Sequence, residues 1–333
     1  MLMKTVNRSC KLLVALLCAF ILFGFKCGKS KPVPVQNTAN EQTMQSILTE
    51  KQFDELFPLR DKFYSYAAFM QAIKELGSTK IKITKRAYQA LQMVSIDKKT
   101  GKATVVREDE GFNEDWAKSK PDSIYYIDFG KFCTEKDSQI NKRELAAFFA
   151  HIAHETRFGQ NGKYDDGLMI RHEADTTLQY VVQNDEYPAV PGKKYYGRGP
   201  MQLSYNGNYG YASHCIFGDK DKLLKNPELV ETDAVVAFKT AVYFWMTPQS
   251  LKPSAHDAMV GNWKPNTAET AKQLEPGFGI TTNIINGALE CGKGDDNASM
   301  QDRIGFYKHF LTRLGTTDDN CVCSCGKMTG YAY

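Results

Sequence analysis

The stretch NKRELAAFFAHIAHET, residues 141–156, carries the clearest helical pattern in the chain. Its apolar residues recur at intervals of three and four, as on one face of an α-helix: Leu145, Phe148 and Ile152. Asn141, followed three residues later by Glu144, fits a capping box and predicts the start of this helix. Gly159 predicts its end. A helix of this length, apolar on one side, needs other helices to cover it.

Such partners follow on both sides of this stretch. Apolar residues at helical spacing begin at Leu48 and return in residues 304–314, before Gly315. In residues 232–246 they cover most of the circumference, which predicts a buried central helix. Residues 79–137 are strongly charged in places, and we expect loops there around one helix near residues 86–94. With no repeat and no strand–helix alternation, the fold class is predicted as mainly α (α+β with minimal β).

Composition limits the classes of protein. The chain has 333 residues, of which 42% are hydrophobic and 24% charged, so wholesale disorder is excluded. The net charge of +4 is spread along the chain and gives no support to a nucleic-acid partner. We expect a monomer.

The first 27 residues have the pattern of a secretory signal. A basic start is followed by an uncharged apolar run, residues 12–25. That run would span only about 21 Å as a helix, short of the roughly 30 Å hydrocarbon core of a membrane. A cleaved signal, a lipid-bearing Cys27 and an uncleaved anchor remain open. All three export the chain, to the outside, the periplasm or the membrane surface, with no other membrane contact expected.

Export affects how the cysteines are interpreted, because oxidising compartments favour disulfides. Six cysteines follow the signal: Cys133, Cys215, Cys291, Cys321, Cys323 and Cys325. Their spacing does not fix the pairing. Residues 321–325 read CVCSC, which is not the spacing of a zinc knuckle, so we expect these cysteines to fasten the tail. The predicted order is a signal (1–27), a linker (28–46), one catalytic domain (47–316, with a possible insertion at 79–137) and a Cys-rich tail (317–333).

Two carboxylates are candidates for chemistry. Glu155 lies close to the apolar face of the helix, where a carboxylate needs partners or a proton. One interpretation is a buried structural Glu paired with a cation such as Arg157 or His151. The other is a general acid whose pKa is raised by partial desolvation. Glu173 is a possible second carboxylate, since glycoside hydrolysis commonly uses an acid and a base on either side of the bond. The alternative is a surface Glu beside Arg171.

The segment PGKKYYGRGPMQLSYNGNYG, residues 191–210, suits a sugar ligand. Tyrosine rings can cover the apolar faces of a sugar while amides and hydroxyls bind its edges. A Gly/Tyr-rich structural loop is the alternative. The chain contains neither HExxH nor GxSxG, so we expect no metal, no cofactor and no serine nucleophile.

Together these motifs resemble the family 19 glycoside hydrolases, the class I/II chitinases. The matching segments follow the family order: HET (154–156), YYGRGPMQLS (195–204), NYG (208–210), FWMTPQ (244–249), KPSAHD (252–257), TNIING (282–287), ECG (290–292) and DRIGFY (302–307). The resemblance covers roughly residues 48–314, and residues 79–137 match poorly.

The resemblance implies a lysozyme-like, two-lobed fold with a substrate cleft. It also implies endo-acting hydrolysis, with inversion, of β-1,4 linkages in chitin or a related N-acetylglucosamine polymer. Glu155 takes the place of the general acid, Glu173 that of the general base and Ser204 that of the serine beside the attacking water. Residues of the substrate cleft are matched by Tyr196, Gln202, Asn208, Asn286 and Arg303. Cys291 matches a cysteine that pairs near the C-terminus, here with Cys321, Cys323 or Cys325.

Two departures keep other functions open. The motif before Glu173 reads Arg171-His172-Glu173, one residue longer than expected, and Arg157 stands where many members have Thr. A cation there could lower a carboxylate pKa and work against the acid. The alternatives are a peptidoglycan hydrolase with the same carboxylates and a catalytically silent chito-oligosaccharide-binding protein.

Overall fold

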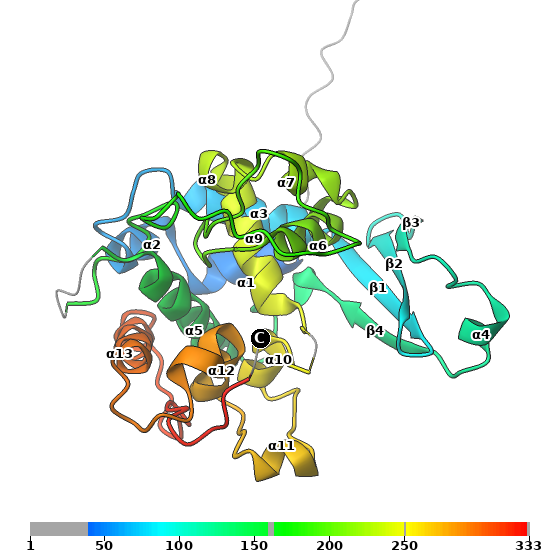
Figure 1. Ribbon diagram of the computed structural model, residues 1–333. Coiled ribbons are helices and arrows are strands. Elements are labelled where there is room, and N and C mark those ends of the chain that lie inside the picture. The colour runs from blue at the N-terminus through cyan, green and yellow to red at the C-terminus, as the bar shows by residue number, and fades with distance from the viewer. Residues whose placement is uncertain (1–38, 159–162, 250, 332–333) are drawn as a thin grey trace, which may run out of the picture. The chain divides into compact units, whose positions relative to one another are not determined.

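Helix α5 (Ser138–Thr156) organises the fold in the computed structural model, which describes residues 39–158, 163–249 and 251–331. It lies beside α13 (Ala298–Arg313) and also contacts α10 (Ala255–Val260) and α12 (Phe278–Glu290) (Figure 1). Phe148 and Phe149 on α5 are fully buried and pack with the rings of Phe69 and Phe310. The apolar stripe seen in the sequence is therefore covered by helices, as expected.

The start of α5 differs from the prediction. The helix begins at Ser138, and its N-cap is Asp137, whose side chain accepts from the N–H of Gln139. Asn141 lies inside the helix and uses its amide to bind the backbone of Glu135, so it does not cap. The sequence suggested the wrong cap because Asn141 serves the loop before the helix. Gly159, the predicted end, lies outside the described residues.

The helices expected from residue 48 onward, over residues 232–246 and over residues 304–314 are present. The apolar run of residues 232–246 forms α9 (Ala234–Met246), with Asp233 as its N-cap and ten buried residues. The remaining helices are α1 (Ala39–Ile47), α2 (Glu50–Leu56), α3 (Tyr66–Gly77), α4 (Asp115–Lys118), η1 (Phe129–Lys131), α6 (Asn206–Phe217), α7 (Asp221–Lys225), α8 (Leu229–Thr232) and α11 (Thr267–Ala271). The mainly helical fold class is confirmed.

The helix expected near residues 86–94 is wrong, because this region forms an antiparallel sheet of order β3-β2-β1-β4. Its strands are β1 (Thr79–Arg86), β2 (Ala90–Asp97), β3 (Ala103–Glu108) and β4 (Ser123–Ile127). The alternating Lys and Ile of β1 have the period of a half-buried strand. The β1–β2 turn has positive φ at Ala87 (47°) and Tyr88 (63°) without a glycine, so the usual turn signal is missing.

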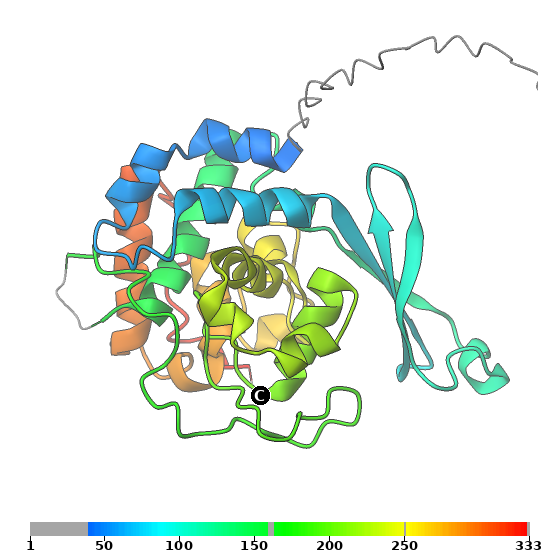
Figure 2. The same ribbon diagram turned by 90° about the horizontal axis from the view of Figure 1, so that it is seen from above.

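One face of this sheet packs on the helices, and the other is open. Ile81, Ile83 and Met93 share the inner face and are at most 1% exposed. Tyr126 and Ile124 lie on the outer face, and each is about half exposed. Figures 1 and 2 both show β1 following directly from α3, with the sheet standing beside the helices. The sheet is thus a region added to the helical part of the fold.

Two predictions concern the N-terminal region, the signal at residues 1–27 and the linker at residues 28–46. Residues 1–38, with the expected signal, lie outside the described residues. The expected linker is wrong for its last part, since Ala39–Ile47 form α1, and the side-chain amide of Asn40 donates to the C=O of Ile73 in α3 (3.0 Å). Among the described helices, none has the length and apolar character needed to cross a membrane.

The cysteines are divided between pairs and free thiols. Cys291 forms a disulfide with Cys325, which confirms the pairing implied by the family resemblance. Cys321 pairs with Cys323. Cys133 and Cys215 are free and buried. The tail is fastened to α12, whose Asn283 binds the backbone of Thr329 and Tyr331.

Candidate active site

Glu155 lies in the last turn of α5, on the side that faces α13. Its Oε1 accepts a hydrogen bond from Arg303 Nη2 at 2.5 Å, and its side chain is 20% exposed. The predicted acid is therefore half-buried and retains a route to solvent. Its partner is the cation Arg303 on α13 and neither Arg157 nor His151, so the pairing with a cation that a structural Glu would need is also present.

Arg303 is shared between two carboxylates. It is 1% exposed, and it also binds Glu290 of α12 through Nε (2.9 Å) and Nη2 (2.8 Å). Burial raises the pKa of Glu290, but the Arg303 guanidinium outweighs burial and lowers it. Asn286 donates to Glu290 Oε1 (2.7 Å) and has a non-helical backbone within α12 (φ −143°). Asn286 thus contacts Glu290, which shares Arg303 with Glu155.

Arg157 does not reach the catalytic carboxylates predicted from the sequence. Its guanidinium binds both oxygens of Asp166 (2.9 and 3.0 Å) and one oxygen of Asp302. The other oxygen of Asp302 lies 2.6 Å from His154 Nδ1. Burial raises the pKa of Asp302, but His154 and Arg157 together lower it. The departure from the family at Arg157 therefore belongs to a separate buried ion cluster.

Glu173 lies in the irregular part of the chain between α5 and α6. Its Oε1 accepts from the N–H of Gly197 (2.6 Å) and its Oε2 from the hydroxyl of Tyr180 (2.9 Å). Its own N–H binds the C=O of Gly197 (3.0 Å). The Glu173 carboxylate raises the pKa of Tyr180 to about 12. Both donors to Glu173 are neutral groups.

Two predicted residues of the 191–210 segment lie beside this carboxylate. A Cβ built on Gly197 would stand 2.9 Å from Gln202 Oε1 and 3.4 Å from Ser204 Oγ, so these side chains surround the backbone that holds Glu173. Ser204 Oγ donates to the C=O of Gln202 (2.9 Å). Asn208 Nδ2 donates to the C=O of Ser204 (2.9 Å). Gly197, Gln202, Ser204 and Asn208 therefore form one local cluster next to Glu173.

Tyr196 turns away from this cluster. Its hydroxyl donates to Glu231 Oε1 (3.4 Å), and the Arg198 guanidinium stacks on its ring at 3.6 Å. Arg198 Nε also donates to Glu231 (3.0 Å), and His172 Nε2 lies 3.9 Å from the same carboxylate. Glu231 thus fixes the chain next to Gly197.

The backbone connects the two carboxylates. The C=O of Thr156, next to Glu155, accepts from the N–H groups of Met169 and Ile170 (3.0 and 3.1 Å). Three residues later Glu173 pairs with Gly197. The segment that carries the predicted base therefore starts at the helix end that carries the predicted acid.

Sequence reasoning missed three residues of the site: Glu290, Tyr180 and Glu231. Glu290 lies four residues after Asn286 on one helix, a spacing that could have indicated their contact. Tyr180 lies on irregular chain, and Glu231 of α8 reaches Tyr196 by a tertiary contact, so no spacing pattern predicts either contact.

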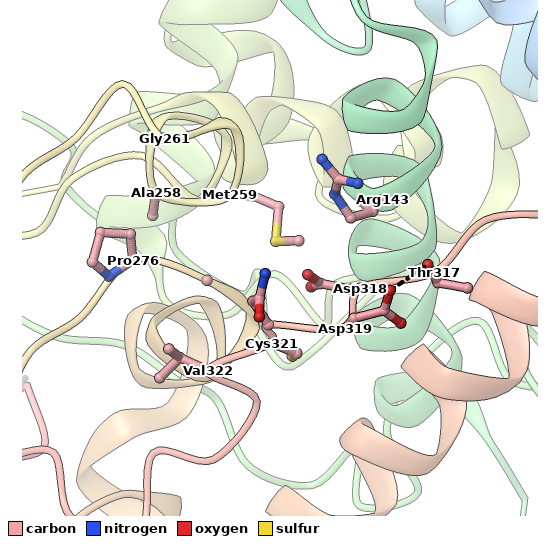
Figure 3. A pocket seen from close by; sticks show the side chains of 12 residues that line it. Arg143, Ala258, Met259, Gly261, Pro276, Thr317, Asp318, Asp319, Cys321 and Val322 are labelled. Atoms are coloured by element: carbon pink, nitrogen blue, oxygen red, sulfur yellow. Dashed lines mark hydrogen bonds between the residues drawn. The ribbon is translucent and has the colours of Figure 1, made fainter.

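A separate hollow lies at the far end of α5. Figure 3 shows its lining, which includes Arg143 of α5 together with Met259, Asp318 and Cys321. The volume of this cavity is about 380 Å³. None of the predicted site residues lines it. The substrate cleft implied by the family resemblance stays a prediction.

Comparison with known proteins gives a consistent result. The family model for class I chitinases, glycoside hydrolase family 19, matches residues 125–323. An endochitinase of Solanum tuberosum is 49% identical over 209 residues, which are 61% of this chain and 62% of that protein. Endochitinase 3 of Nicotiana tabacum is 49% identical over 207 residues, 61% of this chain and 60% of that protein. The matches thus span about three fifths of these curated relatives.

The solved structures agree with this. Chitinase C from Streptomyces griseus HUT6037 superimposes with a TM-score of 0.57 at 28% identity, covering 84% of this chain and 80% of that one. The first two strands and β3 lie before residue 125, so most of the sheet is outside the part that the family model matches. The resemblance seen in the motifs is confirmed, and the chain belongs to glycoside hydrolase family 19, the class I chitinase family.

Proposed function

We propose that this protein is an exported endochitinase that hydrolyses β-1,4 linkages between N-acetylglucosamine units with inversion, with Glu155 as general acid and Glu173 as general base. Family membership and the endochitinase relatives support the reaction class. Arg303, shared between Glu155 and Glu290, holds the Glu155 carboxyl in a fixed position at the end of α5.

The observation that carries the proposal is the backbone link at Thr156. The segment leading to Glu173 is hydrogen-bonded to the helix end that carries Glu155, so the chain folds back and the two carboxylates belong to neighbouring segments. Inverting glycosidases need two such groups about 6.5–9.5 Å apart, with room for one water between them and the sugar.

In the proposed reaction, protonated Glu155 gives its proton to the glycosidic oxygen as the bond to the anomeric carbon breaks. A water attacks that carbon from the opposite face and loses a proton to ionised Glu173. Ser204, beside Gly197 and Glu173, is suited to orient this water. Arg303 keeps Glu155 in place while the proton moves.

The direct test measures sugar release from colloidal chitin by the full chain and by Glu155→Gln. General acid catalysis contributes about 10²–10⁴-fold, so we expect Glu155→Gln to lose at least about 100-fold in turnover while it still binds chito-oligosaccharides. Proton NMR of early product should show the α-anomer. An initial β-anomer would contradict inversion, and substantial turnover by Glu155→Gln would contradict the acid assignment.

The same assay separates the alternatives. Release from purified bacterial cell walls but not from chitin would indicate a peptidoglycan hydrolase. Binding of oligosaccharides without product from either substrate would indicate a silent binding protein.

A further inference from the structure

A second cavity, of about 240 Å³, lies where the sheet meets α10. Its polar lining comes from β1, β4, η1 and α10, with one residue just before η1: Lys80, Tyr126, Asp128, Lys131, His256 and Asp257. Part of this lining belongs to the sheet region before residue 125, which the family model does not match. The cavity therefore combines the added sheet with the helical part of the fold.

His256 is one of the residues that line this cavity, and it is 3% exposed. Its Nδ1 lies 2.6 Å from Oε1 of Glu144, which is fully buried on α5. Glu144 also accepts from the Trp245 indole (2.9 Å) and from the N–H of Cys133 (3.0 Å). An acceptor with these contacts requires the hydrogen on Nδ1 of His256. The opposite nitrogen, Nε2, is buried and has no hydrogen-bond partner among the described residues.

The surroundings of His256 favour its charged form. Burial lowers its pKa, but the Glu144 carboxylate outweighs burial and raises it, and Asp257 and Glu135 act in the same direction. A protonated ring presents an N–H at Nε2 as well. A buried charged donor without a partner is costly, so a ligand that accepts this hydrogen would be stabilising.

The rim adds positive charge. Lys131 Nζ makes no hydrogen bond or ion pair among residues 39–158, 163–249 and 251–331, and Lys80 Nζ contacts the Tyr126 ring at 5.4 Å.

The two acidic residues of the lining already have partners. Asp128 binds Lys98 (2.9 Å) and the N–H of Gly130 (3.0 Å). Asp257 accepts from Ser254 Oγ (2.7 Å) and Asn262 Nδ2 (3.4 Å). The groups left for a ligand are therefore donors and cations.

We infer that this cavity binds a compact tetrahedral oxyanion of the phosphate class, held by His256 Nε2–H with Lys80 and Lys131. These three donors come from three separate elements, β1, η1 and α10, and line the same cavity. The site is distinct from the proposed catalytic pair, because Glu144 precedes Glu155 by about three turns of α5, roughly 16 Å along its axis. The inference is thus independent of the proposed function.

The test titrates inorganic phosphate into the full chain near pH 6 by calorimetry, with chloride keeping the ionic strength constant. The double variant Lys80→Gln/Lys131→Gln should bind at least about ten-fold more weakly, since hydrogen bonds to charged groups are the strong ones. The control Lys82→Gln/Lys136→Gln removes the same charge from lysines outside the cavity and should change affinity less than about two-fold.

A second measurement follows the histidine signals in NMR spectra. The chain has six histidines, and the His256 signal is identified by its loss in His256→Gln. Phosphate should shift this signal in the wild type and not in Lys80→Gln/Lys131→Gln. Equal affinity of the two lysine double variants, or a wild type without saturable phosphate binding, would overturn the inference.

Discussion

The two proposed catalytic carboxylates are held in opposite ways. Glu155 sits at the end of a long helix and is held by a buried guanidinium that it shares with Glu290. Glu173 sits on irregular chain and is held by a backbone N–H and a phenol, both neutral. Fixed charge therefore dominates on one side of the site, and neutral hydrogen bonds on the other.

This difference fits the two roles. A buried charge network needs all its members, because removing one leaves another uncompensated. Neutral donors stabilise an ionised carboxylate without adding a second charge that must itself be compensated. Substitutions around Glu155 should therefore lower the stability of the protein, whereas substitutions around Glu173 should lower its activity alone.

The largest effect is expected when each proposed catalytic carboxylate is replaced with its amide. Glu173→Gln should lower turnover on chitin by about 10²–10⁴-fold, because the base is lost. Its unfolding free energy should change by no more than about 0.5 kcal/mol, since Gln can still bind the N–H of Gly197. Glu155→Gln should lose as much turnover and also about 1 kcal/mol of stability through its weaker bond to Arg303. Urea unfolding beside the chitin assay measures both effects.

The next effect in size concerns Arg303. Arg303→Met leaves Glu155 and Glu290 without their cation, so the unfolding free energy should fall by about 3–5 kcal/mol. The control is Arg313→Met, on the same helix but exposed, where the change should stay within about 0.5 kcal/mol. Equal losses in the two variants would mean that helix α13, and not the charge network, is responsible.

The same contrast explains what the sequence could predict. Glu155 lies on a helix with a regular apolar stripe, so its inward direction follows from spacing. Its partner Arg303 was found only as part of a family motif, because the α5–α13 contact is tertiary. For Glu173, neither Tyr180 nor the Gly197 backbone is marked by any periodicity, since irregular chain has no repeat to read.

The sheet at residues 79–127 was not predicted, for a different reason. The Lys-Ile alternation of β1 is a correct strand signal, but the β1–β2 turn uses Ala87 and Tyr88 at positive φ, where glycine or asparagine is usual. The charged patches at residues 97–99 and 107–110, which predicted solvated loops, lie at strand ends and in the turns that follow them. Asn141 shows a similar limit, because its side chain binds the preceding loop and not the helix end. Local propensity identified Asn141 correctly as a capping type of residue but assigned it the wrong backbone partner.

A smaller effect is expected from the hydrogen bond between Tyr180 and the proposed base Glu173. Tyr180→Phe removes the phenol donor to Glu173 Oε2, a hydrogen bond that favours the ionised form of the proposed base. Turnover should fall roughly ten-fold, and the acid limb of the pH–rate profile should move to higher pH because the ionised form of Glu173 loses a donor.

Tyr205→Phe is the matched control, since the Tyr205 ring packs edge-on against Tyr180 with ring centres 5.1 Å apart. It should leave the acid limb in place. A shift of the limb in both variants would point to ring packing, and no shift in either would remove Tyr180 from the site.

The smallest effect concerns the ion cluster of Asp302, His154 and Arg157 near Glu155. It tests whether this cluster makes the stability of the protein depend on pH in acid. His154 and Arg157 hold the pKa of Asp302 below its usual 3.8, although burial opposes them. A lowered folded pKa contributes stability above pH 3.8, and this contribution is lost as the pH falls through the folded value. Asp302→Asn should therefore melt below the wild type near neutral pH, with a gap that closes in acid.

Asp175→Asn supplies the comparison, because hydrogen bonds from Thr177 also lower the pKa of Asp175, but its carboxylate is fully exposed. Solvent screens such a group, so the melting temperature of this variant should follow the wild type at every pH. A gap for Asp302→Asn that stays constant with pH would mean that the side chain matters through packing alone. A gap that closes only for Asp302→Asn would tie the acid sensitivity to the buried ion cluster beside Glu155, and not to carboxylates in general.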